Sequence, residues 1–488
     1  MSHRSPAEFD RTRRRVSRRA FLKGAAVGGV SMWAAAVLPR RAFMHDPHRP
    51  PKLYEYFVDS FWFDSLRLYE QEINAPLKGR QKADIVIVGG GFAGMASAYH
   101  LAQRFGAQRI VLLEGACCGY GASGRNGGLA DTGFLGFDAL YDEHGPEVAR
   151  AVYDGTLIGL EQIKSLVNAH GIDCDLELNG SISLAIEERH LDRLQEAKSR
   201  FDAMGLPSRL LDKPALQQRI KSERFIGGLL DPSRAILNPA KLARGMKTLI
   251  EGMGVEVFER SKVMHIEPGK VVRVLTEFGE VEAPNCVIAL NGYAPQLGFF
   301  RSRVLPLCNY IVATEPLSDR QMAAIGWNGR EGLSDLRTQF MYLRLTADNR
   351  IVFGGEMSPY YYDSSPSSGN HRPAINRLQR SILTTFPQLE GVQFTHRWGG
   401  TMGFTRDFCP SVGVLGDHAN LYYAVGFSGE GVVMTQLAGK IIGQLMSGER
   451  SELTRLPLVN KKLPYVGHEP FRYPAVKLYE RALRLRQG

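Results

Sequence analysis

One βαβ unit between residues 83 and 115 constrains the fold of this chain more than any other feature. The stretch ADIVIVGGGFAGMASAYHLAQRFGAQRIVLLEG reads as an apolar strand, a glycine turn, an amphipathic helix and a second apolar strand. Strands that are apolar throughout are typical of parallel sheets covered on both faces. We therefore predict an α/β fold with this unit at its centre.

The turn of this unit has the spacing of a dinucleotide-binding motif. It reads Gly89-x-Gly91-x-x-Gly94, and Glu114 follows Gly94 by twenty residues. Gly89 permits the tight turn, Gly91 lets a pyrophosphate approach the backbone, and Gly94 allows close packing of helix and strand. The helix N-terminus would face the phosphates, and the carboxylate of Glu114 would accept hydrogen bonds from ribose hydroxyls.

The next stretch, EGACCGYGASGRNGG at residues 114–128, is unusually rich in small residues. It contains six glycines and two alanines, with one arginine and one asparagine among them. Such a sequence predicts that a bulky group lies close against the backbone. A flexible linker is the alternative, but Arg-Asn-Gly-Gly is not typical of linkers.

The first fifty residues resemble a bacterial export signal. They hold eleven Lys or Arg and three acids, and the heptad SRRAFLK at residues 17–23 resembles the twin-arginine (Tat) motif. The apolar run that follows has about 15 residues, fewer than the ~20 that span a bilayer. We expect a Tat signal segment at 1–44, the Tat export machinery as a partner, and a periplasmic protein, either cleaved or tethered to the inner membrane by a retained signal.

The net charge of +10 does not predict nucleic-acid binding. Residues 461–488 hold seven Lys or Arg and two acids, so that the chain between the two basic ends carries about −3. The six cysteines lack metal-ligand spacing, and no metal site is expected. Tat exports folded proteins, so we also expect a tightly bound cofactor and buried cysteines rather than a disulfide framework.

The rest of the chain alternates between helical and extended patterns. The pattern predicts mainly helices over 136–225 with a strand at 179–186, a helix and then a strand over 236–267, a strand over 281–295, and strands over 305–317 and 338–356, the second with a hairpin at Asp348-Asn349. Residues 397–450 predict a strand at Leu421–Val425, a glycine turn and a long amphipathic helix.

Ordered motifs from residue 60 onward carry a family resemblance. They are DSFWFDSL, GYGASGRNGG, VIALNGY, YIVATEPL, YLRLTADNRIVFGG, RWGGTMGFTRDFCPSVG and GFSGEGVV, and they span some 390 residues. Together they resemble the FAD-dependent amine and amino-acid oxidases of the D-amino-acid oxidase (DAO) type. The resemblance is closest to the γ-glutamylputrescine oxidase branch.

The resemblance implies an α/β fold, α+β overall, in which a Rossmann-type FAD-binding domain carries an inserted antiparallel-sheet substrate domain. The FAD-binding domain would be discontinuous, with residues 83–135, 226–297 and 397–450. Residues 136–225 and 298–396 would form the substrate domain. An N-terminal arm at 45–82 and a basic C-terminal extension at 451–488 complete the chain.

The resemblance also implies how FAD is bound. The segment 119–128 would run along the pyrophosphate and beneath the isoalloxazine ring, and the helix starting near Val432 would point its positive dipole end at the flavin N1–C2=O edge. Covalent attachment stays open, although Cys308 and Cys409 are expected to be core residues. The predicted cofactor-binding residues are Gly89, Gly91, Gly94, Glu114, Ser123, Arg125, Asn126, Gly127, Gly128, Val263, Gly426, Gly429, Gly431 and Val432.

The implied chemistry is oxidation of a C–N bond in an amine or amino acid. Hydride would pass from the α-carbon to flavin N5, and the resulting imine would be hydrolysed. Our candidates for the substrate face are Tyr342, Arg344, Trp398 and Glu430. Tyr342 and Arg344 alternate along one strand, and Arg344 could hold a carboxylate.

Each candidate has an alternative. Arg344 could form an ion pair elsewhere, and Tyr342 and Trp398 could simply pack in the core. Many relatives have His at the position of Glu430, which would either point away from the flavin or engage a cationic substrate.

Three functions remain open. The first is an oxidase that uses oxygen, the second a dehydrogenase that reduces a membrane quinone, and the third a flavin-bound subunit without catalysis.

The C-terminal helix has Val476, Tyr479 and Leu483 on one stripe, which predicts docking on the protein body, with peripheral contact to an anionic membrane as the alternative.

Overall fold

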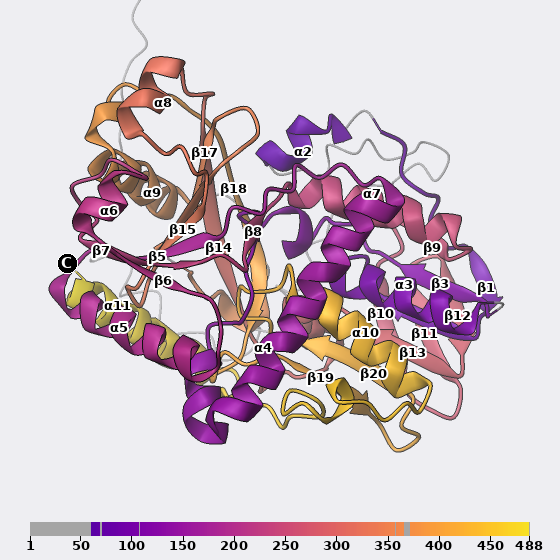
Figure 1. The fold of residues 1–488 in the computed structure, drawn as a ribbon. Coiled ribbons are helices and arrows are strands. Elements are labelled where there is room, and N and C mark those ends of the chain that lie inside the picture. Colours follow the sequence, from indigo (N-terminus) through magenta and orange to yellow (C-terminus); the bar gives the residue numbers. More distant parts are fainter. Residues whose placement is uncertain (1–59, 69–70, 107, 357, 366–370, 488) are drawn as a thin grey trace, which may run out of the picture. The chain divides into compact units, whose positions relative to one another are not determined.

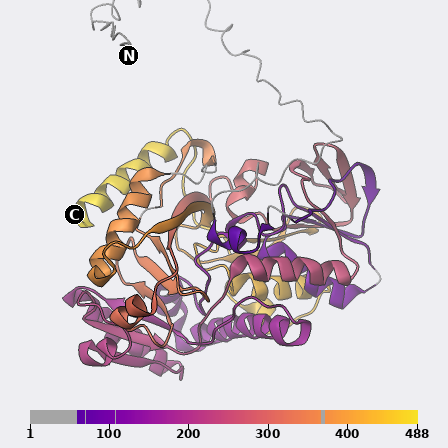
Figure 2. The same ribbon diagram turned by 90° about the horizontal axis from the view of Figure 1, so that it is seen from above.

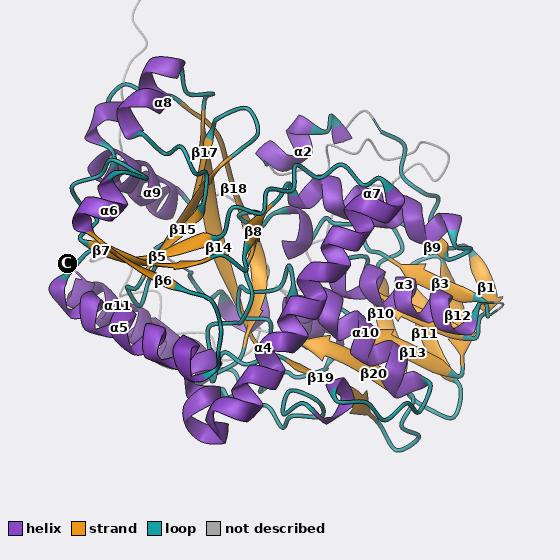
Figure 3. Cartoon of the chain, viewed as in Figure 1, coloured by secondary structure: helices purple, strands orange, loops and turns teal. Residues whose placement is uncertain are grey.

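The computed structural model describes residues 60–487 except 69–70, 107, 357 and 366–370. The predicted signal segment and residues 45–59 of the predicted arm lie outside the described residues. The described part is a mixed α/β structure with two large sheets, which Figure 3 shows as two separate groups of strands.

The smaller of the two sheets has the Rossmann-type order that the βαβ unit predicts. Its strands follow the order β19–β20–β13–β2–β3–β9, parallel except for the edge strand β19. Their bounds are β2 Ile85–Val88, β3 Ile110–Leu113, β9 Glu256–Phe258, β13 Asn285–Ile288, β19 Ser411–Leu415 and β20 Leu421–Val425. Every residue of β2 and β3 is buried, as a sheet covered on both faces requires.

Helices cover one face of this sheet. The helices are α3 (Phe92–Phe105), α7 (Pro239–Gly252), α10 (Met434–Met446) and the long helix α4 (Phe137–His170), which Figure 1 shows beside the strands. Ile85 and Ile87 of β2 belong to the core that these helices share. Helix α4 is kinked at Gly145, which has a φ of +82° and precedes Pro146. The helix expected near Val432 begins two residues later, at Met434.

A four-stranded sheet covers the opposite face. Val86 and Val88 belong to a second core with its strands β12 (Gly279–Ala283), β11 (Val272–Thr276) and β10 (Val263–Glu267), and β1 (Gly79–Lys82) is its edge strand. Two expected strands are in fact two each: 236–267 holds β9 and β10 after the helix, and 281–295 holds β12 and β13. The second pair is separated at Pro284, which has no N–H group to donate to a ladder.

The larger sheet has eight strands in the order β18–β14–β17–β16–β15–β5–β7–β6 and is antiparallel except for the β15–β5 pair. Their bounds are β5 Ser181–Ala185, β6 Arg209–Asp212, β7 Gly227–Asp231, β14 Leu305–Thr314, β15 Gly332–Asp335, β16 Met341–Leu345, β17 Ile351–Gly355 and β18 Phe394–Phe404. The predicted hairpin at Asp348-Asn349 is confirmed as the turn between β16 and β17. The helices of this half are α5 Glu188–Ala203, α6 Lys213–Gln217, α8 Asp319–Ile325 and α9 Arg372–Thr385.

The predicted domain boundaries stay a prediction. Two strands at those boundaries, β7 and β18, hydrogen-bond within the larger sheet. The prediction places β7 and residues 397–404 of β18 in the FAD-binding domain, and residues 394–396 in the substrate domain. Strands β4 (Leu129–Ala130) and β8 (Ala235–Ile236) form a separate two-stranded ladder outside the two large sheets.

Two further helices lie outside the sheets. Helix α2 (Phe61–Ser65) belongs to the predicted arm, and its three aromatic side chains are buried. Helix α11 (Arg472–Gln487), yellow in Figure 2, lies beside the half that contains the larger sheet. It is held there by buried Arg472, which donates to the Arg301 carbonyl and the Ser364 hydroxyl.

Candidate functional site

A cavity of about 1740 Å³ extends from the glycine turn of the βαβ unit to the larger sheet. Its wall combines the start of α3, the small-residue segment 120–127, β16, the loop 427–432 and α11. Pockets for one small ligand have roughly 300–1,000 Å³, so this cavity has room for a cofactor and a substrate together.

The glycines of the turn are fixed by close backbone contacts. Gly89 has a φ of +109°, and a Cβ there would lie 2.6 Å from the Ala289 carbonyl oxygen. A Cβ on Gly94 would lie 1.9 Å from the Gly89 carbonyl oxygen. Gly89, Gly91 and Ala93 line the cavity, so the N-terminus of α3 opens onto it, as a pyrophosphate site requires.

Glu114 lies at the end of β3 and lines the same part of the cavity. Its carboxylate accepts hydrogen bonds from the backbone N–H groups of Gly90 at 2.7 Å and Ala116 at 2.8 Å. Burial raises the pKa of Glu114 to about 7, and the Glu259 carboxylate adds to this, whereas the two N–H groups oppose it. Neutral or charged, the group is placed to accept from a hydroxyl in the cavity.

Two other predicted residues lie around this end. Ser123 Oγ accepts from the Phe92 N–H at 2.8 Å, so the hydroxyl sits at the first turn of α3. Val263 lines the cavity with its neighbours Lys262 and Met264, beyond Glu114. The phosphate contact of Ser123 and the adenine contact of Val263 stay predictions.

The segment 119–128 is small partly because the protein itself packs against it. A Cβ on Gly124 would lie 2.5 Å from the Gly119 carbonyl oxygen, one on Gly127 2.5 Å from the Tyr342 ring, and one on Gly128 2.3 Å from the Leu237 carbonyl oxygen. The other side of the segment lines the cavity, with residues 120–123 and 125–127. The segment is therefore a thin wall between the cavity and the core.

Arg125 is the clearest sign of a missing acceptor in this wall. Its side chain is buried, its Nη1 donates to the Gly399 carbonyl at 3.2 Å, and its guanidinium lies 4.0 Å from the Tyr120 ring centroid. Its Nε and Nη2 atoms are buried without a partner among the described residues. Buried donors are nearly always satisfied, so this guanidinium fits a cavity whose ligand brings hydrogen-bond acceptors, as a flavin does.

The C-terminal glycine turn forms the opposite wall. Gly429, Gly431 and Val432 line the cavity just before α10. Gly426 lies behind them with a φ of +78°, where a Cβ would meet the Thr405 methyl group at 2.4 Å. The first N–H groups of α10 thus lie next to the cavity.

Glu430 projects from this turn into the cavity and has no hydrogen bond or ion pair from its side chain within the described part of the chain. Burial raises its pKa to about 7, the nearby Asp131 carboxylate raises it further, and Arg234 opposes both. A half-buried carboxyl without a partner is suited to bind a cation from a ligand.

Tyr342 lines the cavity from β16, and its hydroxyl donates to the Asn309 side chain at 2.7 Å. Burial and the neighbouring Glu430 raise the pKa of Tyr342, so the phenol stays protonated. Asn309 in turn donates to the Ser358 hydroxyl at 3.0 Å. The three side chains form a polar strip along the wall.

Arg344 and Trp398 do not reach the cavity, and this corrects the prediction that they face the substrate. Both are fully buried. Arg344 donates to the carbonyls of Gly128 at 3.1 Å and Leu237 at 2.5 Å, and burial lowers its pKa to about 10. Trp398 donates to the Arg125 carbonyl at 2.8 Å.

The sequence did not point to a charged network that lines the cavity near Glu430. Arg234 Nε lies 2.8 Å from an Asp231 oxygen, and Arg234 Nη1 lies 3.6 Å from Asp131. Tyr153 donates to Asp231 at 3.0 Å. These residues come from β7, α4 and the end of β4, and no local motif joins them, so only the fold brings them together.

All six cysteines are buried free thiols. Burial raises the pKa of Cys117 to about 12, which leaves the thiol protonated and unreactive. Across residues 60–487, leaving out the gaps, no group of three or more His, Cys, Asp or Glu side chains could hold a metal ion. No helix in the same residues is long and apolar enough to cross a membrane.

Comparison with known proteins gives one consistent family. The DAO family, described as FAD dependent oxidoreductase, matches residues 84–445. The probable oxidoreductase OrdL of Haemophilus influenzae is 32% identical over 82% of this chain and 91% of its own length. The γ-glutamylputrescine oxidoreductase of Escherichia coli is 33% identical over 80% of this chain and 89% of its own.

The fold agrees with solved structures. Glycine oxidase from Geobacillus kaustophilus superposes with a TM-score of 0.65 at 21% identity, covering 76% of this chain and 96% of that one.

Proposed function

Because the chain belongs to the DAO family of FAD-dependent oxidoreductases, whose members related to it act on C–N bonds of amines and amino acids, we propose that its substrate is a primary amine joined to a second polar group, as in a γ-glutamylated diamine. The name of the E. coli relative supports this class of substrate. The volume of the cavity and the charged groups along its wall also favour an extended, polar molecule.

The residues that would hold FAD are those of the glycine turn, Glu114, Ser123 and the wall from Tyr120 to Gly127. Bound FAD supplies the acceptor for a hydride from the carbon next to the amine nitrogen. Arg125 would donate to the cofactor or the substrate through its two unpaired nitrogens, and the start of α10 would favour negative charge beside it.

The observation that carries the proposal is the unpaired carboxyl of Glu430 in the cavity wall. In its ionised form it would bind the ammonium group of an arriving amine. A pKa of about 7 makes the carboxylate a stronger base than an ordinary glutamate, so it would act as a general base that accepts an ammonium proton as the neutral amine reacts. The groups that face it are Asp131, Arg234 and Tyr342.

Glu430→Gln tests this role. We expect the KM for the amine to rise about tenfold or more, since a charge-assisted hydrogen bond is lost, while FAD content stays the same. In the unchanged protein kcat/KM should rise as the pH increases through about 7, because the ionised form is needed, and the variant should lose this rise. The exposed Glu390→Gln is the control. An unchanged KM and pH profile in the Glu430 variant would contradict the proposal.

We further propose that oxygen is the electron acceptor, so that hydrogen peroxide is the second product. The oxidase names of several relatives favour this. A membrane quinone is the alternative, favoured by the exposed Phe471 and Leu478 in the basic C-terminal extension.

We propose, lastly, that the protein is exported through the Tat system and acts in the periplasm. The support is the SRRAFLK heptad, which lies outside the described residues. Replacing Arg18 and Arg19 by lysine should retain the protein, with its FAD, in the cytoplasm, as fractionation of bacterial cells would show. Equal periplasmic amounts of both forms would contradict the proposal.

A further inference from the structure

Three backbone carbonyls in or next to the cavity wall, within residues 125–128, each accept a hydrogen bond from a fully buried side chain. Trp398 Nε1 donates to the Arg125 carbonyl at 2.8 Å, Trp62 Nε1 to the Asn126 carbonyl at 2.8 Å, and Arg344 Nη1 to the Gly128 carbonyl at 3.1 Å. The donors come from β18, α2 and β16, which are far apart in the chain. Their three acceptors lie within one stretch of four residues, 125–128.

The three donors form one group behind the wall. The rings of Trp62 and Trp398 pack edge to face with centroids 6.4 Å apart, and the Arg344 guanidinium lies 5.3 Å from the Trp62 ring centroid. Arg344 has no ion pair within the described part of the chain. Burying a guanidinium without a carboxylate is costly, and the hydrogen bonds to backbone carbonyls offset part of the cost of burying Arg344.

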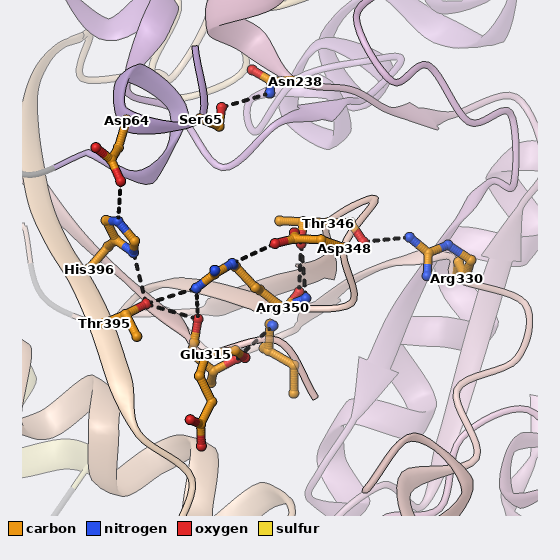
Figure 4. A network of polar contacts seen from close by, with 12 residues as sticks. Asp64, Ser65, Asn238, Glu315, Arg330, Thr346, Asp348, Arg350, Thr395 and His396 are labelled. Atoms are coloured by element: carbon orange, nitrogen blue, oxygen red, sulfur yellow. Dashed lines mark hydrogen bonds and ion pairs between the residues drawn. The ribbon is translucent and has the colours of Figure 1, made fainter. Parts of the chain in front are cut away.

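Helix α2 brings Trp62 to this place and is fixed at both sides. Figure 4 shows Asp64 paired with His396 of β18, with Nε2 and Oδ2 3.1 Å apart, and Ser65 accepting from Asn238 at 3.4 Å. Asn238 is the N-cap of α7. Helix α2 therefore contacts both β18 of the larger sheet and the start of α7 in the nucleotide-binding half, next to segment 119–128.

The wall packs closely against its neighbours at Gly127 and Gly128. Gly127 already lies against Tyr342, and Gly128 against the Leu237 carbonyl, so closely that neither has room for a Cβ. On its other side the same segment presents the unpaired nitrogens of Arg125 to the cavity. A change in the three hydrogen bonds would therefore shift the guanidinium and the surface on which a flavin would lie.

We propose that Trp62, Arg344 and Trp398 are positioning residues that hold the flavin-binding wall by its carbonyls, and that the N-terminal arm is thereby part of the cofactor site. None of the three touches the cofactor or the substrate. They act through residues 125–128. The proposal depends on the FAD site of the family and not on which amine is oxidised.

The test replaces each indole donor by a ring that cannot donate, in Trp62→Phe and Trp398→Phe. Trp327→Phe is the matched control: Trp327 is also fully buried, stacks on Phe386, and its Nε1 has no partner among the described residues. The apoprotein of each variant is titrated with FAD, and the visible absorption and circular dichroism of the bound flavin are recorded with the melting temperature.

We expect FAD affinity to fall about three- to tenfold in Trp62→Phe and Trp398→Phe, because each variant loses one buried hydrogen bond. The circular dichroism spectrum of the bound flavin should also change. In turnover kcat should fall while the KM for the amine stays the same. Trp327→Phe should change neither the FAD affinity nor the spectrum.

If Trp62→Phe and Trp398→Phe match Trp327→Phe in affinity and spectrum at equal melting temperature, the proposal is wrong. If one variant does not fold, the other still decides, because each donor binds a different carbonyl. A protein that binds FAD as expected but oxidises no amine would contradict the proposed function and leave this inference intact.

Discussion

Arg125 and Glu430 line the cavity with side-chain atoms that have no partner among the described residues. Arg125 donates from Nη1 to the Gly399 carbonyl, but its Nε and Nη2 atoms are unpaired. The charges closest to Glu430 are matched, since Arg234 lies between Asp131 and Asp231. We propose that ligands complete both groups, with the flavin on the Arg125 side and the amine at Glu430.

Arg125→Met should separate cofactor binding from folding. Two buried donors toward the ligand and the contact with Tyr120 would be lost, so we expect FAD affinity to fall about ten- to a hundredfold, the range for hydrogen bonds to charged groups. Titration of the apoprotein with FAD measures it. Arg125→Lys should recover part of the affinity. Full affinity in Arg125→Met would show that the guanidinium is not directed at the ligand.

The comparison of Tyr342 with Arg344 shows where reasoning from sequence ends at this scale. Both side chains lie on the same face of β16, as their spacing predicts, but two residues along a strand are about 7 Å apart. Tyr342 is therefore at the cavity, whereas Arg344 lies beyond its edge among backbone carbonyls. Sequence spacing gives the face of a strand and not where the cavity stops.

At the scale of elements, the strand–turn–helix at the start of the βαβ unit forms the end of the cavity that we assign to the nucleotide. Its conformation could be predicted because the whole arrangement lies in one segment of about thirty residues with fixed spacings. The charged network of Asp131, Asp231 and Arg234 could not be predicted, because Asp131 is about 100 positions from the other two in the sequence. They come together only when β4, just before Asp131, pairs with β8, just after Arg234. Pro284, which has no N–H group, marks the point in the sequence at which 281–295 divides into two strands.

Gly94→Ala tests the packing of this element. The new methyl carbon would lie 1.9 Å from the Gly89 carbonyl oxygen, so the turn must shift. We expect the free energy of unfolding to fall by about 2 kcal/mol and FAD binding to be lost, as chemical denaturation and flavin absorbance would show.

Gly252→Ala at the end of α7 is the control for that substitution. A Cβ there meets no atom within 4 Å, so stability should change by less than about 1 kcal/mol. Retention of FAD by Gly94→Ala, at the stability of the control, would contradict the assignment of the turn.

At the scale of the described part as a whole, the cavity is a joint product of both large sheets. The Rossmann-type half supplies the glycine turn, Glu114 and the loop of Glu430, and the larger sheet supplies Tyr342 and Asn309. Helix α11 adds Val476, Tyr479 and Leu483 to the cavity wall, so the stripe expected to dock on the protein body does face it. Contact of this helix with a membrane stays a prediction.

The central claim is that this chain uses bound FAD to oxidise a primary amine with a second polar group. The most direct measurement is anaerobic titration of the purified holoprotein with a γ-glutamylated diamine, followed by its absorbance in the visible range. We predict loss of the yellow colour at one equivalent of substrate, and its return with hydrogen peroxide on admission of air. A flavin that keeps its colour with this substrate and with free diamines and amino acids would contradict the claim. If the colour returns only when a quinone is added, the electron acceptor is a quinone and not oxygen.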